Sequence, residues 1–171
     1  MTIRTRFAPS PTGNVHIGNI RAAIYNWLFS RHAGGEFLLR IEDTDLERST
    51  PAAVKTVLDS LAWLGLTYAG TPLYQSTQKA RHLEIAEQLL AQGAAYKEDK
   101  GGTGKGECII FKMPGKDISF HDEVKGDISK KAEDLKDFVI VRSDGSPVFH
   151  LGNVVDDITM GITHVIRGDD H

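Results

Sequence analysis

The sequence predicts the α/β fold class, and three observations support this prediction. Two short apolar runs, residues 3–8 and 37–41, enclose a segment whose apolar residues recur at helical spacing. This strand–helix–strand order is typical of a parallel crossover, and two further helical segments follow it. Between residues 97 and 135 the chain becomes glycine-rich and polar before apolar runs return. These observations predict a Rossmann-like parallel sheet with flanking helices and a small inserted α+β subdomain.

The first predicted strand, residues 3–8, is apolar and ends in a Pro-Ser-Pro-Thr-Gly turn. A helix is predicted over residues 18–32, where the apolar residues at spacings of three and four are Ile20, Ile24, Trp27 and Leu28. Gly34 and Gly35 end this helix, and the compact apolar run at residues 37–41 predicts a buried second strand.

Two more helices are predicted from capping residues. Thr50 and Pro51 form a favourable N-cap and first-turn pair, and Gly65 closes the helix that they begin. Its apolar stripe consists of Val54, Val57, Leu58 and Leu61. A third helix is predicted to begin near Ser76 and to end at Gly93, with one apolar face made of Leu83, Ala86, Leu89 and Leu90.

The segment after the third helix is predicted to be an insertion. Strands are expected at residues 108–113 and 118–120, with an irregular polar stretch at 124–136. Apolar runs at residues 138–141 and 163–166 predict strands that return to the main core. The predicted division of the chain is a first Rossmann-like part at 1–96, a reduced insertion at 97–135 and a returning Rossmann-like part at 136–171.

Composition excludes several classes of protein. The net charge of -3 argues against a uniformly basic nucleic-acid-binding chain. Cys108 is the one cysteine, so a disulfide framework is excluded. No apolar run approaches the roughly 20 residues of a membrane span, and no signal sequence is visible at the N-terminus. We therefore expect a cytoplasmic protein with no membrane association.

The segment at residues 10–19 carries the clearest chemical signal. His16 and Gly18 lie where the first helix begins, and the free N–H groups of a helix N-terminus favour phosphate. Gly18 removes a side chain, which would let a base or ribose approach, and His16 offers a ring N–H to a phosphate oxygen. The alternative is an N-capping histidine beside a glycine that packing alone requires.

This segment also carries a family resemblance. Ser10-Pro11-Thr12-Gly13 followed by His16-Ile17-Gly18-Asn19 resembles the glutamyl-tRNA synthetase form of the class I HIGH motif, with Asn19 in place of the last histidine. Four further stretches match this family in order: Leu-Arg-Ile-Glu-Asp-Thr-Asp at 39–45, Trp-Leu-Gly-Leu at 63–66, Val-Val-Asp-Asp at 154–157 and the segment at 163–171. Several ordered matches are more specific than one motif.

The resemblance implies ATP-dependent ligation of L-glutamate to tRNA through glutamyl-adenylate, with ATP and Mg²⁺ and with tRNA(Glu) as partner. The family's second phosphate-binding motif would lie beyond His171. The resemblance therefore implies a partial catalytic domain with little or no charging activity alone, belonging to an enzyme that is monomeric when complete.

The family's substrate-binding residues can be carried over onto this sequence. Arg6 and Arg167 match the arginines that hold the substrate's side-chain carboxylate, and Glu42 matches the residue that meets its α-ammonium. The positions that match other pocket residues are Ala8, Ser10, Phe149 and Asn153, with Phe149 where many members carry tyrosine. The ATP-contacting positions are His16, Gly18, Asn19 and Asp170, of which His16 and Gly18 are also expected to be catalytic.

Each of these assignments has a structural alternative. Arg6 and Arg167 could be ion-paired with acids of the 42–45 segment, and Glu42 could cap the next turn. The acidic group made of Asp156, Asp157, Asp169, Asp170 and His171 could suggest a metal site, although solvated acids at strand ends explain it more simply.

Two stretches resemble known binding motifs but lack residues that those motifs require. The glycine-rich stretch at residues 101–106 lacks the Ser or Thr that follows the lysine of a P-loop, so we interpret it as a flexible turn. Cys108 alone cannot build the zinc site that many relatives carry in this region, so no zinc is expected.

Two other functions stay open at this point. One is a synthetase-like enzyme that glutamylates a modified tRNA base. The other is a non-catalytic module that retains the nucleotide pocket.

Overall fold

The computed structural model describes residues 2–12, 15–45, 47–100 and 106–168. The chain divides into two compact units, Met1–Gln78 with Asp156–His171, and Lys79–Val155. In the part of the chain that is described, no helix is long and apolar enough to cross a membrane.

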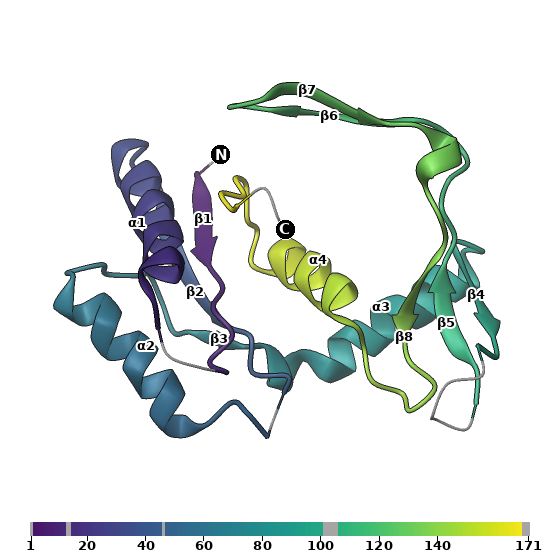
Figure 1. Ribbon diagram of the computed structural model, residues 1–171, viewed down its shortest axis with the longest axis horizontal. Helices are drawn as coiled ribbons and strands as arrows, with labels where there is room; N and C mark the ends of the chain where they lie inside the picture. Colours follow the sequence, from purple (N-terminus) through teal and green to yellow (C-terminus); the bar gives the residue numbers. More distant parts are fainter. Residues whose placement is uncertain (1, 13–14, 46, 101–105, 169–171) are drawn as a thin grey trace. The chain divides into compact units, whose positions relative to one another are not determined.

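The first unit contains a three-stranded parallel sheet in the order β1-β2-β3, which confirms the predicted parallel crossover between the first two strands (Figure 1). Its elements are β1 (Arg4–Phe7), α1 (Ile17–His32), β2 (Glu36–Ile41), α2 (Pro51–Trp63), β3 (Leu73–Tyr74) and the 3₁₀ turn η1 (Gln75–Gln78). The four longer elements lie where the sequence predicts them.

Alternation along β1 and β2 gives this sheet two different faces. Side chains of successive strand residues point to opposite faces. One face carries the buried apolar core of the unit, composed of Phe7, Ala23, Phe37, Leu39, Ile41, Val57, Leu61 and Leu66. The other face carries Arg4 and Arg6 of β1, with Glu36 and Arg40 of β2. The sheet is therefore apolar on one side and charged on the other.

Short-range interactions define the two ends of α2, as the sequence predicts. The Thr50 hydroxyl accepts a hydrogen bond of 3.1 Å from the Ala53 N–H at the start of α2. Gly65 has a φ of 70° just beyond the end of that helix, a conformation that suits glycine. These short-range interactions explain why α2 could be predicted from the sequence.

The second unit is built on an antiparallel sheet in the order β4-β5-β8 and a separate hairpin, β6-β7. Its elements are α3 (Lys79–Ala91), β4 (Ala95–Glu98), β5 (Cys108–Phe111), β6 (Ile118–Asp122), β7 (Gly126–Lys130), the 3₁₀ turn η2 (Ala132–Asp134) and β8 (Phe138–Val141). Helix α4 (Phe149–Thr159) begins in this unit and ends in the first. The buried core of the second unit consists of Ala86, Ala95, Ile109, Ile140, Val141, Leu151 and Val155.

Several sequence predictions for the second half of the chain are wrong. The stretch at 124–136 is not irregular, because β7 pairs with β6, and Asp122 Oδ1 closes their turn by accepting from the N–H groups of Val124 and Lys125. Strand β8 pairs with β5 in the antiparallel sheet rather than joining the parallel one. Helix α4 was not predicted.

The strand predicted at residues 163–166 is also absent, although this segment is attached to the first unit. The N–H groups of Thr163 and His164 both donate to the Arg4 carbonyl, at 3.0 and 3.2 Å. The predicted domain boundaries, 96/97 and 135/136, differ from the edges of the compact units, which fall at 78/79 and 155/156, and they stay predictions.

Candidate functional site

Four charged side chains meet at the carboxyl ends of β1 and β2. Arg6 is on β1, Arg40 is on β2, Glu42 directly follows β2, and Asp157 is on the last turns of α4. Alternation on the strands places Arg6, Arg40 and Glu42 on the charged face of the sheet. We call these four residues the charge cluster.

Asp157 joins the two arginines of the charge cluster. Its Oδ1 and Oδ2 accept from Nε and Nη2 of Arg6 at 3.0 and 3.1 Å, a bidentate arrangement. Oδ1 also accepts from Nη1 of Arg40 at 2.5 Å. Arg40 Nη2 in turn donates to Glu42 Oε1 at 3.1 Å. The cluster therefore forms one connected chain of hydrogen bonds with two cations and two acids.

Burial makes the charge cluster unusual on this sheet. The side chains of Arg40, Glu42 and Arg6 are 0, 6 and 9 % exposed, and that of Asp157 is 20 % exposed. Burial raises the pKa of the Glu42 carboxyl, while the charge and hydrogen bond of Arg40, and more weakly the charge of Arg6, act to lower it. Glu42 is thus a carboxylate whose ionisation depends on its arginine neighbours.

The loops around the charge cluster are held by further hydrogen bonds. The Glu42 N–H donates to the Pro9 carbonyl at 2.9 Å, which fastens the loop after β1 beside the end of β2. Asp43 accepts from the N–H and hydroxyl of Ser76 at 2.8 and 2.7 Å, which ties the next turn to η1. These contacts fix the segments that carry Ala8, Ser10 and Glu42.

His16 caps the N-terminus of α1, as the structural alternative for this residue supposed. Its Nδ1 accepts from the Gly18 N–H at 3.1 Å. A ring nitrogen that accepts a hydrogen bond carries no proton, so the ring proton is on Nε2. His16 is exposed, so its Nε2–H is a donor at the helix N-terminus. This arrangement suits an anionic group and is compatible with the predicted phosphate contact.

Gly18 leaves room for the histidine cap. A Cβ atom at this position would lie 2.9 Å from Cε1 and 3.0 Å from Nδ1 of His16, closer than normal contacts. Glycine therefore lets the imidazole turn back over the helix. Asn19 lies one residue further along, and its N–H donates to the His16 carbonyl at 3.0 Å.

The remaining predicted residues are divided between the two compact units. Ala8 and Ser10 lie in the loop beside Glu42, with Ser10 exposed. Arg167 is in the first unit, and its side chain is exposed. Phe149 and Asn153 lie on the part of α4 that belongs to the second unit, so they are not placed relative to Arg6.

Asp170, the predicted ribose contact, lies outside the described residues, as do Asp169, His171 and residues 101–105 of the predicted flexible turn at 101–106. The two other acids of the suggested metal group are not solvated acids at a strand end. Asp156 and Asp157 are in helix α4, where Asp156 is buried and accepts from Gln75 Nε2 at 2.8 Å.

The partner of Arg6 differs from those that the sequence suggested. Of the three acids considered, Glu42 is bonded to Arg40, Asp43 to Ser76 and Asp45 to Arg48. Arg6 binds Asp157 instead. Sequence reasoning did not name Arg40 as a site residue, and it considered Asp157 only in the suggested metal group. The available signal was alternation, which places charged residues on one face at positions 4, 6, 36, 40 and 42.

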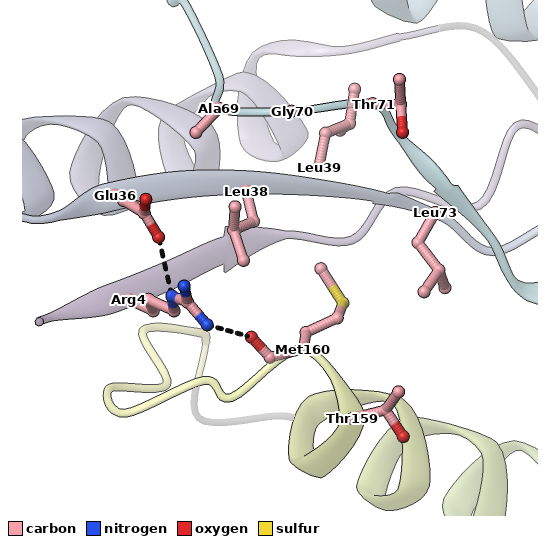
Figure 2. A pocket seen from close by; sticks show the side chains of 10 residues that line it. All are labelled: Arg4, Glu36, Leu38, Leu39, Ala69, Gly70, Thr71, Leu73, Thr159 and Met160. Carbon is pink, nitrogen blue, oxygen red and sulfur yellow. Dashed lines mark hydrogen bonds and ion pairs between the residues drawn. The ribbon is translucent and has the colours of Figure 1, made fainter.

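A separate open pocket of about 400 Å³ lies toward the amino ends of the same strands (Figure 2). Figure 2 shows Arg4 at its edge, donating to Glu36 Oε2 at 2.7 Å and to the Met160 carbonyl at 3.4 Å. The lining also includes Leu38, Leu39, Ala69, Gly70, Thr71, Leu73 and Thr159. None of the predicted site residues lines this pocket, so it does not mark the candidate site.

Comparison with solved structures identifies the class of fold. The chain is similar to the crystal structure of a glutamate tRNA ligase from Elizabethkingia meningosepticum in complex with its amino acid, with a TM-score of 0.83 and 31 % identity over 99 % of this chain and 44 % of that one. The crystal structure of a putative arginyl tRNA synthetase from Campylobacter jejuni, 17 % identical with a TM-score of 0.55, shares the fold. The architecture is that of a class I synthetase catalytic domain.

Sequence comparison gives the family. The family described as tRNA synthetases class I (E and Q), catalytic domain, matches residues 2–103 and 97–171, and the chain belongs to it. A glutamate–tRNA ligase 1 from Gluconacetobacter diazotrophicus is 46 % identical over all of this chain and 44 % of its own length. A glutamate–tRNA ligase from Legionella pneumophila is 44 % identical and 43 % covered. The chain thus spans less than half the length of the curated relatives that it matches.

Proposed function

We propose that the protein containing this chain ligates L-glutamate to tRNA, using ATP and passing through glutamyl-adenylate, and that this chain supplies part of the catalytic domain. The observation that carries the proposal is the arrangement of Arg6 and Glu42 at the carboxyl ends of adjacent parallel strands, where ligands commonly bind in α/β sheets. Relatives named glutamate–tRNA ligase support the choice of amino acid.

Arg6 and Glu42 complement the two charged ends of a glutamate molecule. In the described residues, Arg6 uses its Nε–Nη2 edge for Asp157, which leaves the Nη1 side for the substrate's side-chain carboxylate. Glu42 would accept from the α-ammonium. Arg167 would be the second arginine of the pocket, and the other pocket positions would be Ala8, Ser10, Phe149 and Asn153.

ATP would bind at the start of α1. The Nε2–H of His16 would donate to a phosphate oxygen, and the first N–H groups of the helix, near Gly18 and Asn19, would favour its charge. Asp170 would face the ribose. Mg²⁺ is expected to arrive with the ATP phosphates. We assign no protein ligand to it, since the described part of the chain holds no group of three side chains suited to a metal ion.

The chemistry needs positioning more than proton transfer. The substrate α-carboxylate would attack the α-phosphorus of ATP, and the bond to the pyrophosphate leaving group would break. A carboxylate is already an ionised nucleophile, so no general base is required. The side chains would hold the two reactants in line and stabilise charge on the phosphates. The glutamyl group would then pass to the terminal ribose of tRNA. We place this reaction in the cytoplasm.

The amino-acid assignment is tested by charging tRNA with glutamate and with glutamine, using the full protein that contains this chain. Arg6→Ala removes the guanidinium group and should lower kcat/KM for glutamate. The expected decrease corresponds to a loss of about 2–5 kcal/mol in transition-state stabilisation, the usual cost of breaking a buried charge contact. Glutamine use should fall much less. Equal losses for the two amino acids would refute the proposed role of Arg6.

The ATP site is tested separately through KM for ATP. His16→Ala and Gly18→Val should each raise it, because the first removes the donor and the second crowds the imidazole. His32→Ala is the matched control, since His32 is an exposed histidine at the other end of α1. A similar rise in all three variants would show that the helix start is not the ATP site.

A further inference from the structure

We propose that Asp157 is a positioning residue for the recognition of the amino-acid substrate, acting through Arg6 and held in place by Arg40. The inference rests on the proposed function and deepens it. Asp157 is in the last helix of the described chain, 151 residues from Arg6 in sequence, so this role belongs to the folded arrangement rather than to a local motif.

The geometry of the Arg6 guanidinium group supports this role. A guanidinium group presents two edges that each suit one carboxylate. Asp157 occupies the Nε–Nη2 edge of Arg6 with contacts of 3.0 and 3.1 Å. Among the described residues, Nη1 of Arg6 makes no hydrogen bond or ion pair. The bidentate contact therefore fixes the plane of the guanidinium and leaves its Nη1 side as the donor for a second carboxylate.

Arg40 connects Asp157 to Glu42. Its side chain is fully buried and donates from Nη1 to Asp157 and from Nη2 to Glu42. One buried cation thus holds both Asp157, the acid bound to Arg6, and Glu42, the proposed contact of the α-ammonium. Asp157 would orient the residue for the side-chain carboxylate, and Glu42 would receive the α-ammonium. Arg40 would set the spacing between these two recognition points.

Charge alone and positioning make opposite predictions for Asp157→Asn. The substitution removes one negative charge beside Arg6, so simple attraction would draw an anionic substrate more strongly. Loss of the bidentate contact would instead let Arg6 turn away from the substrate. Misplacing a contact group by about 1 Å can cost on the order of 100-fold, so positioning should dominate.

The experiment measures KM for glutamate, KM for ATP and kcat for tRNA charging in the full protein that contains this chain. Asp157→Asn should raise KM for glutamate by about 10- to 100-fold and leave KM for ATP within about twofold. Asp157→Glu, which keeps the charge, should show a smaller rise, of about threefold or more. Glu36→Gln is the matched control, since Glu36 pairs with Arg4 on the same face of the sheet and should leave both KM values unchanged.

A double-mutant cycle separates positioning from general destabilisation. If Asp157 acts through Arg6, adding Asp157→Asn to Arg6→Ala should cause little further loss in glutamate use. Additive losses, or an equal rise in both KM values, would overturn the inference. If Asp157→Asn does not fold, Asp157→Glu decides, and an unchanged KM for glutamate in that variant overturns it.

The failure of this inference differs from the failure of the proposed function. A parent protein that charges no tRNA with glutamate overturns both. A parent that charges tRNA normally, together with an Asp157→Asn variant whose KM for glutamate is unchanged, overturns the role of Asp157 alone.

Discussion

The two ends of β1 and β2 carry the same kinds of side chain in different surroundings. At the amino ends, Arg4 and Glu36 face each other in register, and their side chains are 42 and 39 % exposed. At the carboxyl ends, the charge cluster of Arg6, Arg40, Glu42 and Asp157 is largely buried. The arginines of β1 are two residues apart on one face, so strand geometry is the same for both. The two ends differ in how far their side chains are exposed to water.

This difference assigns different roles to similar ion pairs. A partly exposed pair such as Arg4–Glu36 contributes about 0–1 kcal/mol, because water screens its attraction. A buried pair must first overcome the loss of hydration of both ions, so it is weak evidence for stability by itself. The charge cluster offsets that loss by joining two cations and two acids through several hydrogen bonds. We therefore relate the carboxyl end to recognition and the amino end to ordinary surface pairing.

The largest expected effect is the loss of stability when Arg40, in the buried charge cluster, is replaced. Arg40→Met leaves Glu42 and Asp157 buried with one cation fewer, and removing one partner of a buried ion pair typically costs about 3–5 kcal/mol. The free energy of unfolding in urea at neutral pH measures this loss. Arg4→Met is the matched control on β1 and should cost far less. A loss below about 1 kcal/mol for Arg40→Met would mean that the cluster is not structurally coupled.

The next largest effect is expected at the amino end of β2, where the backbone of Gly35 lies too close to β1 to accept a side chain. A Cβ atom on Gly35 would lie 2.2 Å from the Ile3 carbonyl oxygen, so Gly35→Ala must displace the backbone where β2 begins beside β1. We expect a loss of about 1–3 kcal/mol in the free energy of unfolding, as for other overpacked sites.

Gly34→Asn is the matched control for Gly35→Ala. Gly34 has a φ of 63°, a Cβ atom added to it would meet no other atom within 4 Å, and asparagine tolerates this backbone conformation. Its loss should therefore be the smaller of the two. The reverse order would show that backbone conformation, rather than close approach to β1, constrains this turn.

The contrast between the two compact units explains which parts of the fold the sequence could predict. In the first unit, the Thr50 cap and the glycine at position 65 act within a few residues, so α2 was predictable. In the second unit, β8 joins the antiparallel sheet by pairing with β5, a strand that is distant in sequence. A short apolar run such as residues 138–141 carries no information about which strand it will pair with.

The candidate site shows the same limit. Arg6, Glu42 and His16 were found through a family pattern that is local in sequence. Arg40 was overlooked inside an apolar run, because the reason for a buried arginine lies with Asp157, 117 residues away. Alternation along β2 indicated its face but not its partner. The structural alternative for His16 was equally visible in sequence, and the helix cap that it makes is compatible with a phosphate contact.

A smaller effect should appear in the pH dependence of stability, where Glu42 and Asp45 respond in opposite directions. Burial raises the pKa of Glu42 above 4.5, whereas hydrogen bonds and the charge of Arg48 lower the pKa of partly exposed Asp45 below 3.8. Stability contributed by Glu42 is fully present below its unfolded pKa and is lost as pH rises through its folded pKa. For Asp45, stability is present above 3.8 and is lost as pH falls through the lowered value. The Glu42 effect is limited because Arg40 opposes the desolvation.

Urea unfolding on both sides of pH 4.5 tests this sign. The free energy of unfolding of the parent, relative to Glu42→Gln, should fall as pH rises through the raised pKa of Glu42. Relative to Asp45→Asn, the parent should instead gain stability as pH rises through the lower range of Asp45. The same sign for both carboxylates would contradict the assigned burial of Glu42.

The smallest expected effect is at Glu36. Arg4 also donates to the Met160 carbonyl, so Glu36→Gln isolates the ion pair better than a change at Arg4 does. Because both side chains are about two-fifths exposed, we expect a loss of about 0–1 kcal/mol in the free energy of unfolding. Raising the salt concentration to about 1 M should remove most of this difference, since the screening length then falls to about 3 Å. The loss in Arg40→Met should persist at the same salt concentration, because the ions of the charge cluster are shielded from solvent. If the two losses were equal, or equally sensitive to salt, burial would not be what separates the two ends of the sheet.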